Sequence, residues 1–379
     1  MFVYICKMKT TRIKMLEDWF ASEHEYALKG RHIVSNDILP LLKKLPIAFK
    51  VNKIGASFLK NDIYKVSIGK GSQRILIWTQ MHGNESTGTK ALFDLFNFFS
   101  REHKLSVVAD KILRNCTIVC IPILNPDGAL AYTRVNAQNI DLNRDVIDKK
   151  AVESRILQDL LKEVDPHFCF NMHDQRTIFS VGKANNPATL SFLAPSTDVE
   201  RTLTEGRKQT MAVIMSMHNL LEKCIPNQIG RYTDEFYPTA TGDNFQKMGH
   251  NTILIESGHF KGDYSREETR KFTFYALLQG IDYISDVPKS ILYKDYFDIP
   301  NNEKFYLDII LKNVDYKGKS TDVGFLFEER LEGGQLYFIP KIEKEGDLSN
   351  YNADKTIPGH TLSFSDENKL IDWVKNEIN

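Results

Sequence analysis

The chain has 379 residues, of which 42% are hydrophobic and 26% charged, the proportions of an ordinary soluble globular protein. Its 49 basic and 49 acidic residues give a formal net charge of zero, which offers no basic field to nucleic acid or to an anionic membrane. No run approaches the length of a membrane-spanning helix. We therefore expect neither a nucleic-acid partner nor a membrane partner.

The N-terminus places an apolar stretch before its first lysine, which is the reverse of a secretory signal peptide. The five cysteines are an odd, scattered set that indicates reduced, buried thiols rather than a disulfide framework or a cysteine metal site. Both features predict a cytoplasmic protein. The cysteines are Cys6, Cys116, Cys120, Cys169 and Cys224.

Predicted helices and strands alternate along most of the chain. The predicted helices are residues 15–48, 87–101, 154–164, 200–223 and 266–284. The predicted strands are residues 64–70, 73–80, 118–124, 167–173 and 251–256. The first two strands flank Gly69 to Gly71, which predicts a hairpin, and residues 118–124 end at the turn sequence NPDG. Strands that are apolar on both faces indicate an α/β sheet covered on both sides.

The pattern changes after about Pro288, where alternating strands follow one another and a helix returns only near the C-terminus. Gly333 and Gly334 predict a hairpin turn in this part. We divide the chain into an N-terminal helical segment (1–50), a catalytic domain (51–288) and a small β-rich C-terminal appendage (289–379).

Three apolar strands end in residues that commonly bind metals. The first ends at His82, with Glu85 close behind, the second at His173 and the third at Glu256. In open α/β sheets, ligand sites lie at the carboxyl ends of the strands, so groups remote in sequence can meet at one edge. A single histidine at a strand end is usually structural, and a lone HxxE is a weak motif. The conjunction of all four residues is what predicts a site.

Two histidines and one carboxylate leave a fourth coordination position open, which is typical of catalytic rather than structural zinc. Zinc lowers the pKa of water at such a position toward about 7. Glu256 is then a candidate to take a proton from that water and pass it to a leaving amine.

A second cluster lies in residues 125–145, which contain Arg134 and the adjacent pair Asn143 and Arg144. A guanidinium group offers a planar fork for a carboxylate. Taken alone, however, this segment reads as a solvated loop with surface arginines.

The ordered motifs HGNE, NPDG, R-x-N…DLNR, a strand-end histidine and a strand-end glutamate span residues 64–285 and resemble the zinc carboxypeptidase family, whose best-known member is carboxypeptidase A. The resemblance implies a three-layer α/β/α fold with a twisted mixed sheet. It also implies a metallopeptidase with one Zn²⁺ per chain, which hydrolyses the C-terminal amide bond of a peptide. In this family pattern His82, Glu85 and His173 bind zinc, and Glu256 is the general base.

The same resemblance assigns roles around the substrate. Arg134 would polarise the scissile carbonyl and stabilise the oxyanion. Asn143 and Arg144 would hold the terminal carboxylate, and Asp141 would orient a zinc-binding histidine. Tyr237 resembles the mobile tyrosine that closes over the substrate.

The chain also departs from the digestive carboxypeptidases. Asn84 stands where they carry an arginine, and residues 241–244 should line the side-chain pocket without indicating one specificity residue. The spacing from Glu85 to His173 is shorter than theirs. It is closer to the related aspartoacylase and succinylglutamate desuccinylase branch, which also carries a β-rich C-terminal domain.

Three functional hypotheses therefore stay open. NPDG and R-x-N…DLNR favour a metallocarboxypeptidase, whereas the spacing and the appendage favour an amidohydrolase of N-acyl amino acids. The third is an inactive binding protein on the same scaffold. The expected partner is a peptide or a small carboxylate-bearing amide, and the sequence leaves the oligomeric state open.

Overall fold

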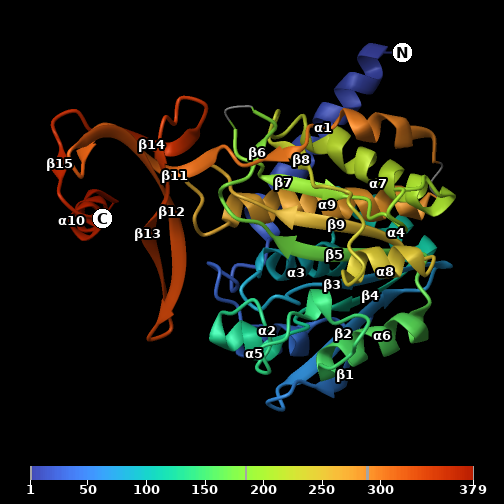
Figure 1. Ribbon diagram of the computed structural model, residues 1–379. Helices are drawn as coiled ribbons and strands as arrows, with labels where there is room; N and C mark the ends of the chain where they lie inside the picture. Colours follow the sequence, from blue (N-terminus) through green and yellow to red (C-terminus); the bar gives the residue numbers. More distant parts are fainter. Residues whose placement is uncertain (1, 184–185, 287–289, 379) are drawn as a thin grey trace.

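The computed structural model describes residues 2–183, 186–286 and 290–378. Its main sheet has eight strands, which are shown in Figure 1. In spatial order they are β1 (Lys50–Ala56), β2 (Asp62–Gly69), β4 (Cys116–Ile121), β3 (Gln73–Trp78), β5 (Phe168–Asp174), β9 (Asn251–Ser257), β7 (Leu190–Leu193) and β8 (Ile229–Arg231). β4, β3, β5 and β9 run parallel to one another. β2 is antiparallel to both of its neighbours, β1 and β4, and β7 is antiparallel to β9. The sheet is mixed, as predicted.

Helices cover both faces of this sheet, which confirms the predicted three layers. Ile75 and Ile77 pack into the core under α3, α7 and α9, whereas Leu76 and Trp78 pack into the core under α6 and α8. Neighbouring strand residues point to opposite faces, so an apolar run without alternation marks a strand buried on both. The helices are α1 (Phe2–Glu23), α2 (Ser35–Lys44), α3 (Thr87–Ser100), α4 (Ser106–Asn115), α5 (Pro126–Ala131), α6 (Val152–Val164), α7 (Glu205–Leu221), α8 (Thr241–Lys247) and α9 (Glu267–Ser285).

The predicted hairpin between the first two strands is wrong, because β4 lies between β2 and β3. The glycines do not form a hairpin turn; they allow this segment to lie close to the start of β4. The Gly71 amide donates to the Cys116 carbonyl at 3.1 Å, and a Cβ atom on Gly71 would lie 1.8 Å from the carbonyl carbon of Asn115. The glycine thus lets the chain pass the start of β4.

Helical structure is not continuous over residues 15–48, because α1 ends at Glu23 and α2 begins at Ser35. Tertiary contacts replace the helical hydrogen bonds between them. The Arg270 guanidinium donates to the carbonyls of Glu25 and Leu28 at 2.7 and 2.6 Å. Arg270 is itself paired with the buried Asp94 at 2.7 Å. The other predicted helices and strands are present, with shifted ends.

A second sheet follows α9 and carries the C-terminal part of the chain. Its strands are β13 (Gln335–Gly346), β12 (Lys319–Glu332), β11 (Tyr306–Tyr316) and β14 (Asn352–Pro358), with β15 (Ser363–Phe364) also beside β11. The helix α10 (Glu367–Ile378) packs Leu370 and Val374 into the core of this sheet. Gly333 and Gly334 both have positive φ and join β12 to β13, which confirms the predicted hairpin turn.

The four described cysteine thiols form no disulfide. Burial raises the pKa of each thiol, as expected for reduced structural cysteines. None of the described helices combines the length and the apolarity that crossing a bilayer would require.

Candidate metal centre and substrate site

The loop that follows β3 is fixed by an unusual residue and a close backbone contact. Gln80 has a φ of 48°, a left-handed value that is uncommon for a residue other than glycine. Its side-chain amide donates to the carbonyls of Ile33 and Gly83, both at 2.9 Å. A Cβ atom on Gly83 would lie 1.9 Å from the carbonyl carbon of Gly128. The glycines of HGNE and NPDG therefore allow the two loops to touch.

The motif asparagines shape these loops. NPDG begins the short helix α5, and Asn125 caps it by accepting from the Gly128 amide at 2.9 Å. The same side chain donates to the Met81 carbonyl at 3.2 Å, next to His82. Further along, Asn136 accepts from the main chain of residues 138 and 140, both at 3.0 Å. These contacts hold the metal-binding loop and its neighbour in place.

His82, Glu85 and His173 converge at the carboxyl edge of the main sheet, where their ligand atoms all lie within 4.8 Å of one another. The two oxygens of Glu85 lie 2.9 Å from His82 Nδ1 and 2.9 Å from His173 Nδ1. The two Nδ1 atoms are 3.1 Å apart. All three residues are buried.

This donor set fits a zinc ion. Zinc–nitrogen bonds of about 2.0–2.1 Å in a tetrahedron place neighbouring ligand atoms about 3.3 Å apart, close to the observed 3.1 Å between the two Nδ1 atoms. His82 Nε2 lies 3.0 Å from Asp141 Oδ1, and a proton shared there leaves Nδ1 free to bind metal. Three protein ligands leave the fourth position of a tetrahedral site open.

Burial and the neighbouring charges act in opposite directions on the pKa values of the cluster. Burial lowers the pKa of His82, but the carboxylates of Glu85 and Asp141 outweigh this effect, so the pKa rises overall. Burial lowers the pKa of His173. Burial by itself would raise the pKa of Glu85, yet the two imidazoles hold it well below its usual value. Glu85 is therefore a carboxylate, the form that binds a cation.

Glu256 lies beside this cluster. β5 and β9 are parallel, and His173 is directly in register with Glu256, so both side chains leave the same face of the sheet. Within the described residues, no hydrogen bond holds the Glu256 carboxyl group. Burial, together with the charges of Glu85 and Asp174, raises its pKa well above the usual value. A carboxylate with a raised pKa is a better proton acceptor.

Arg134 and Asp141 lie on another side of the cluster. Arg134 Nε is 3.1 Å from Asp141 Oδ2, and its Nη1 is 3.4 Å from Glu85 Oε1. The Arg134 side chain is 48% exposed, so its guanidinium group borders both the cluster and solvent. It is placed to donate to a molecule that approaches the metal centre.

Asn143, Arg144 and Tyr237 form a second group of residues, which is linked to the cluster where the Asn143 backbone amide donates to Asp141 at 2.9 Å. Asn143 accepts from the Thr241 amide at 3.2 Å, which joins its loop to the start of α8. The guanidinium of Arg144 lies 4.4 Å from the centre of the Tyr237 ring. The structure thus places these three residues around the N-terminus of α8.

Two polar residues at this site were not singled out from the sequence, although one of them lies in the stretch 241–244 that was expected to line the side-chain pocket. Asp243 lies in the first turn of α8 and is only 6% exposed. It accepts from the Tyr237 amide at 3.1 Å and forms no direct ion pair with a described residue, although the charges of Arg144 and Arg207 lower its pKa. Burial raises its pKa to about 6. The sequence contains one indication of this residue, which is that residues 241–244, expected to line the side-chain pocket, include an acidic residue.

Asn171 is the second missed residue. It precedes His173 by two positions on β5, so both side chains share one face of the strand. Both polar atoms of its side chain are buried without a partner among the described residues. A Cβ atom on Gly242 would lie 3.7 Å from Asn171 Nδ2, so the amide adjoins the residue before Asp243. The sequence indicated this residue only as a single asparagine within the mostly apolar run HFCFNMH.

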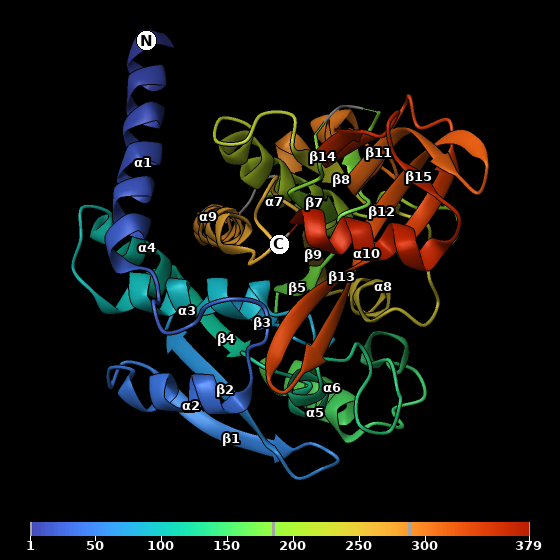
Figure 2. The same cartoon turned by 90° about the vertical axis from the view of Figure 1, so that its left-hand side faces the viewer.

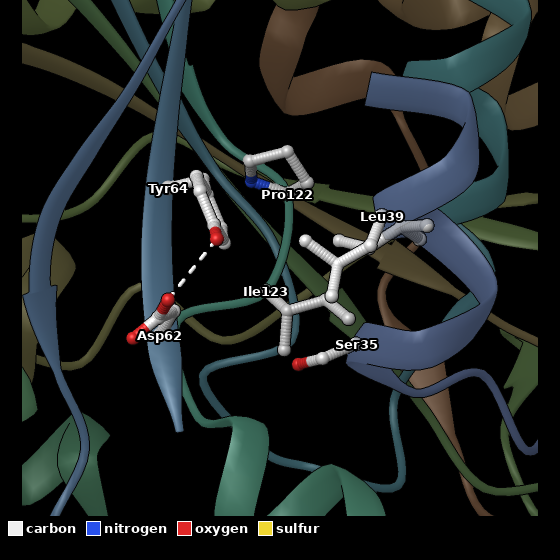
Figure 3. A pocket seen from close by; sticks show the side chains of 7 residues that line it. Ser35, Leu39, Asp62, Tyr64, Pro122 and Ile123 are labelled. Atoms are coloured by element: carbon white, nitrogen blue, oxygen red, sulfur yellow. Dashed lines mark hydrogen bonds between the residues drawn. The ribbon is translucent and has the colours of Figure 1, made fainter. Parts of the chain in front are cut away.

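A separate small pocket, shown in Figure 3, has no comparable chemistry. It lies between α2, β2 and the turn after β4 and encloses about 10 Å³, room for about one water molecule. Its only carboxylate, Asp62, accepts from the Tyr64 hydroxyl at 3.1 Å. The metal cluster is therefore the candidate catalytic centre.

Residues 37–188 match the family model described as zinc carboxypeptidase. Carboxypeptidase 2 of Trichophyton tonsurans is 32% identical to this chain over 126 residues, which are 32% of this chain and 22% of that protein. Carboxypeptidase SOL1 of Arabidopsis thaliana is 39% identical over 69 residues, which are 18% of this chain and 14% of that protein. The chain thus spans about a fifth or less of the length of these two relatives.

Solved structures share the fold. A metallo-carboxypeptidase from Burkholderia cenocepacia superimposes with a TM-score of 0.53 at 15% identity, covering 66% of this chain and 67% of that one. A metallo-carboxypeptidase from Pseudomonas aeruginosa, solved in complex with (2-guanidinoethylmercapto)succinic acid, gives a TM-score of 0.52 at 13% identity, covering 66% and 68%. The three-layer architecture is therefore that of metallocarboxypeptidases.

Proposed function

Because residues 37–188 belong to the zinc carboxypeptidase family, we propose that this protein is a zinc-dependent metallocarboxypeptidase that hydrolyses the C-terminal amide bond of a peptide. The observation that carries the proposal is the convergence of His82, Glu85 and His173, with Glu256 in register beside them. Glu256 lies beyond the matched residues, so its role rests on this geometry.

The reaction would use two groups of the protein together with a metal ion. A bound zinc ion supplies Lewis acidity at the scissile carbonyl and lowers the pKa of nearby water. Glu256 accepts a proton from the attacking water and delivers it to the departing nitrogen. Arg134, at the border of the cluster, donates to the oxygen on which negative charge develops.

The substrate's terminal carboxylate belongs on Arg144 and Asn143. A guanidinium can donate two parallel hydrogen bonds to a carboxylate, and its partial burial strengthens them. Tyr237 stands next to Arg144 and is placed to cover the bound residue. This arrangement favours substrates with a free C-terminus.

Replacing Arg144 by Ala should lower kcat/KM for peptides with a free C-terminus by roughly 10–100-fold, the value of a charge-assisted hydrogen bond of about 1.5–3 kcal/mol. The residual hydrolysis of C-terminally amidated peptides should change little, since they lack the carboxylate. Steady-state kinetics on paired free and amidated peptides measures both. Arg155→Ala, on α6, is the matched control. Equal losses on both substrates would remove Arg144 from this role.

Asp243 and Asn171 give the neighbouring pocket a chemical preference. Burial outweighs the charges of Arg144 and Arg207 at Asp243, so its carboxylate would be stabilised by a further cation that pairs with it directly. The unpartnered Asn171 amide, which adjoins Gly242, adds a hydrogen-bonding group at the start of α8. We extend the proposal to substrates whose C-terminal residue is lysine or arginine. The ligand of the Pseudomonas aeruginosa structure likewise combines a guanidino group with carboxylates.

Replacing Asp243 by Asn keeps an acceptor for the Tyr237 amide but removes the charge. We expect kcat/KM for peptides ending in lysine or arginine to fall by about 10–100-fold, and that for peptides ending in leucine to stay nearly constant. In the unchanged protein, KM for the cationic substrates should rise as the pH falls below about 6, because protonation neutralises Asp243. Asp159→Asn, on the exposed side of α6, is the control. A uniform loss over all side chains would contradict this assignment.

The amidohydrolase hypothesis keeps two observations in its favour, the short spacing from Glu85 to His173 and the second sheet that follows the first. Rates on N-acyl amino acids and on peptides of the same C-terminal residue separate the two activities. We place the peptidase first because the family match and the curated relatives are carboxypeptidases.

A further inference from the structure

One face of the hairpin formed by β12 and β13 is partly covered, by loops of the main domain and, at Phe327, also by the core of the second sheet. Along the second half of β12, Phe327, Glu329 and Leu331 are half-buried, while the residues between them are exposed. The alternation follows from the two-residue period of a strand and shows which face is covered. The residues opposite them on β13 are Pro340, Phe338 and Leu336.

This face touches two loops at the metal centre through Glu329. The Glu329 carboxylate lies 2.6 Å from Arg31 Nη1 and accepts a hydrogen bond from the Tyr132 hydroxyl. The Arg31 carbonyl accepts from Ser86, the residue after Glu85. Tyr132 stands two positions before Arg134 in the chain. Glu329 thus joins the hairpin to both segments.

Two further loops contact the hairpin. The ring of Tyr264, in the segment after β9, lies 5.2 Å from the ring of Phe327 and 5.5 Å from that of Phe338. Arg176, three positions after His173, is 3.3 Å from Glu343. The hairpin therefore spans the carboxyl edge of the main sheet, and Figure 2 shows it in front of β5 with α8 to one side.

The hairpin is firmly held in this position. Phe327 donates its amide to Asp308 at 2.7 Å, and the Tyr264 hydroxyl donates to the same carboxylate at 3.0 Å. The Arg31 side chain is 10% exposed, so separating it from Glu329 would leave a buried charge without its partner. These contacts make the hairpin a fixed wall.

The groups of the proposed carboxylate pocket are held by residues outside the hairpin. Asn143 and Asp243 hydrogen-bond to residues 237–241, and Arg144 stacks on Tyr237. In the described ranges none of these groups bonds to the hairpin. A peptide with its last residue in that pocket must extend the rest of its chain from the metal centre toward the other side.

We propose that the β12–β13 hairpin limits the substrate to short peptides, because it blocks the path of a chain that extends from the scissile bond toward its N-terminus. This inference rests on the proposed carboxypeptidase function and names its substrate class. Dipeptides and tripeptides fit beside the wall, whereas long peptides and the tails of folded proteins do not. Glu329 is the positioning residue that fixes the wall.

The first test needs no variant. The zinc-loaded full chain is given an N-acetylated dipeptide ending in lysine and longer alanine-extended peptides that share its last two residues. kcat/KM should fall by at least about tenfold from the dipeptide to the longest peptide, through a weaker fit of the extended chain. A metallocarboxypeptidase without such a wall would show no fall with length.

Two variants then assign the effect to the hairpin. The first removes Leu331, Glu332, Gln335 and Leu336, so that Gly333 and Gly334 join the paired residues Arg330 and Tyr337. The second is Glu329→Gln. Both should raise kcat/KM for the longest peptide by about tenfold while leaving the dipeptide rate nearly unchanged. The control, Glu328→Gln, changes an exposed carboxylate on the opposite face of the same strand.

The outcomes separate the two proposals. Equal cleavage of short and long peptides by the unchanged protein would overturn the wall and leave the carboxypeptidase assignment standing. A length dependence that survives in the shortened hairpin would also overturn it, provided that the dipeptide rate shows a folded enzyme. If the zinc-loaded protein cleaves none of the peptides, the proposed function fails and this inference fails with it.

Discussion

Replacing Glu256 by Gln should lower kcat by roughly 10²–10⁴-fold, the usual contribution of a general acid–base residue, while one zinc ion still binds per chain. The amide has nearly the shape of the carboxyl group but cannot accept the proton of the attacking water. Because Glu256 is not among the three converging ligands, its loss leaves the metal cluster intact. Kinetics on one peptide, combined with metal analysis of the same sample, measures both effects.

Glu268→Gln is the matched control for this change. Glu268 lies on α9, where it pairs with Lys271 at the surface. The control should keep full activity and full zinc content. An active Glu256→Gln enzyme would mean that another group accepts the proton, whereas a zinc-free variant would show that Glu256 belongs to the metal site.

The second large effect concerns the metal. Replacing His173 by Ala removes one of three ligands, so we expect zinc content to fall from one per chain toward zero and activity to fall with it. Zinc added to the unchanged protein should raise its melting temperature, since the ion binds only the folded cluster. Elemental analysis and thermal unfolding with and without a chelator follow both quantities.

Two further substitutions provide reference values for the zinc content of the His173 variant. Asp141→Asn should weaken zinc affinity by only about 10–100-fold, because Asp141 orients His82 without binding the ion. His360→Ala, at an exposed position, should leave zinc content unchanged. Full zinc occupancy in the His173 variant would refute the proposed ligand set.

The metal cluster was predictable because each of its members lies at the end of an apolar strand or shortly after it. The strands before His82 and His173 are buried on both faces, so the sequence shows them as short apolar runs that end abruptly in polar groups. The common edge then follows from the parallel arrangement. Asp141, predicted as the acceptor for a zinc-binding histidine, indeed lies 3.0 Å from His82 Nε2.

The errors arose where distant chain segments decide the local structure. Gly69 to Gly71 resemble a hairpin turn, and nothing nearby shows that β4 will insert between β2 and β3. The segment after Glu23 has helical spacing, but Arg270 takes the carbonyls that a helix would use. Gly242, the residue before Asp243, adjoins Asn171 only because α8 packs against the sheet beside β9. Local patterns contain none of this information.

The bond between Arg31 and Glu329 also has a consequence for biosynthesis. A ribosome delivers the chain from its N-terminus, so every proposed zinc ligand and Glu256 emerge before the hairpin that we propose restricts access to them. A nascent chain that has folded through α9 would therefore hold a complete hydrolytic centre without its restriction. Selectivity would be the last property that the growing polypeptide acquires.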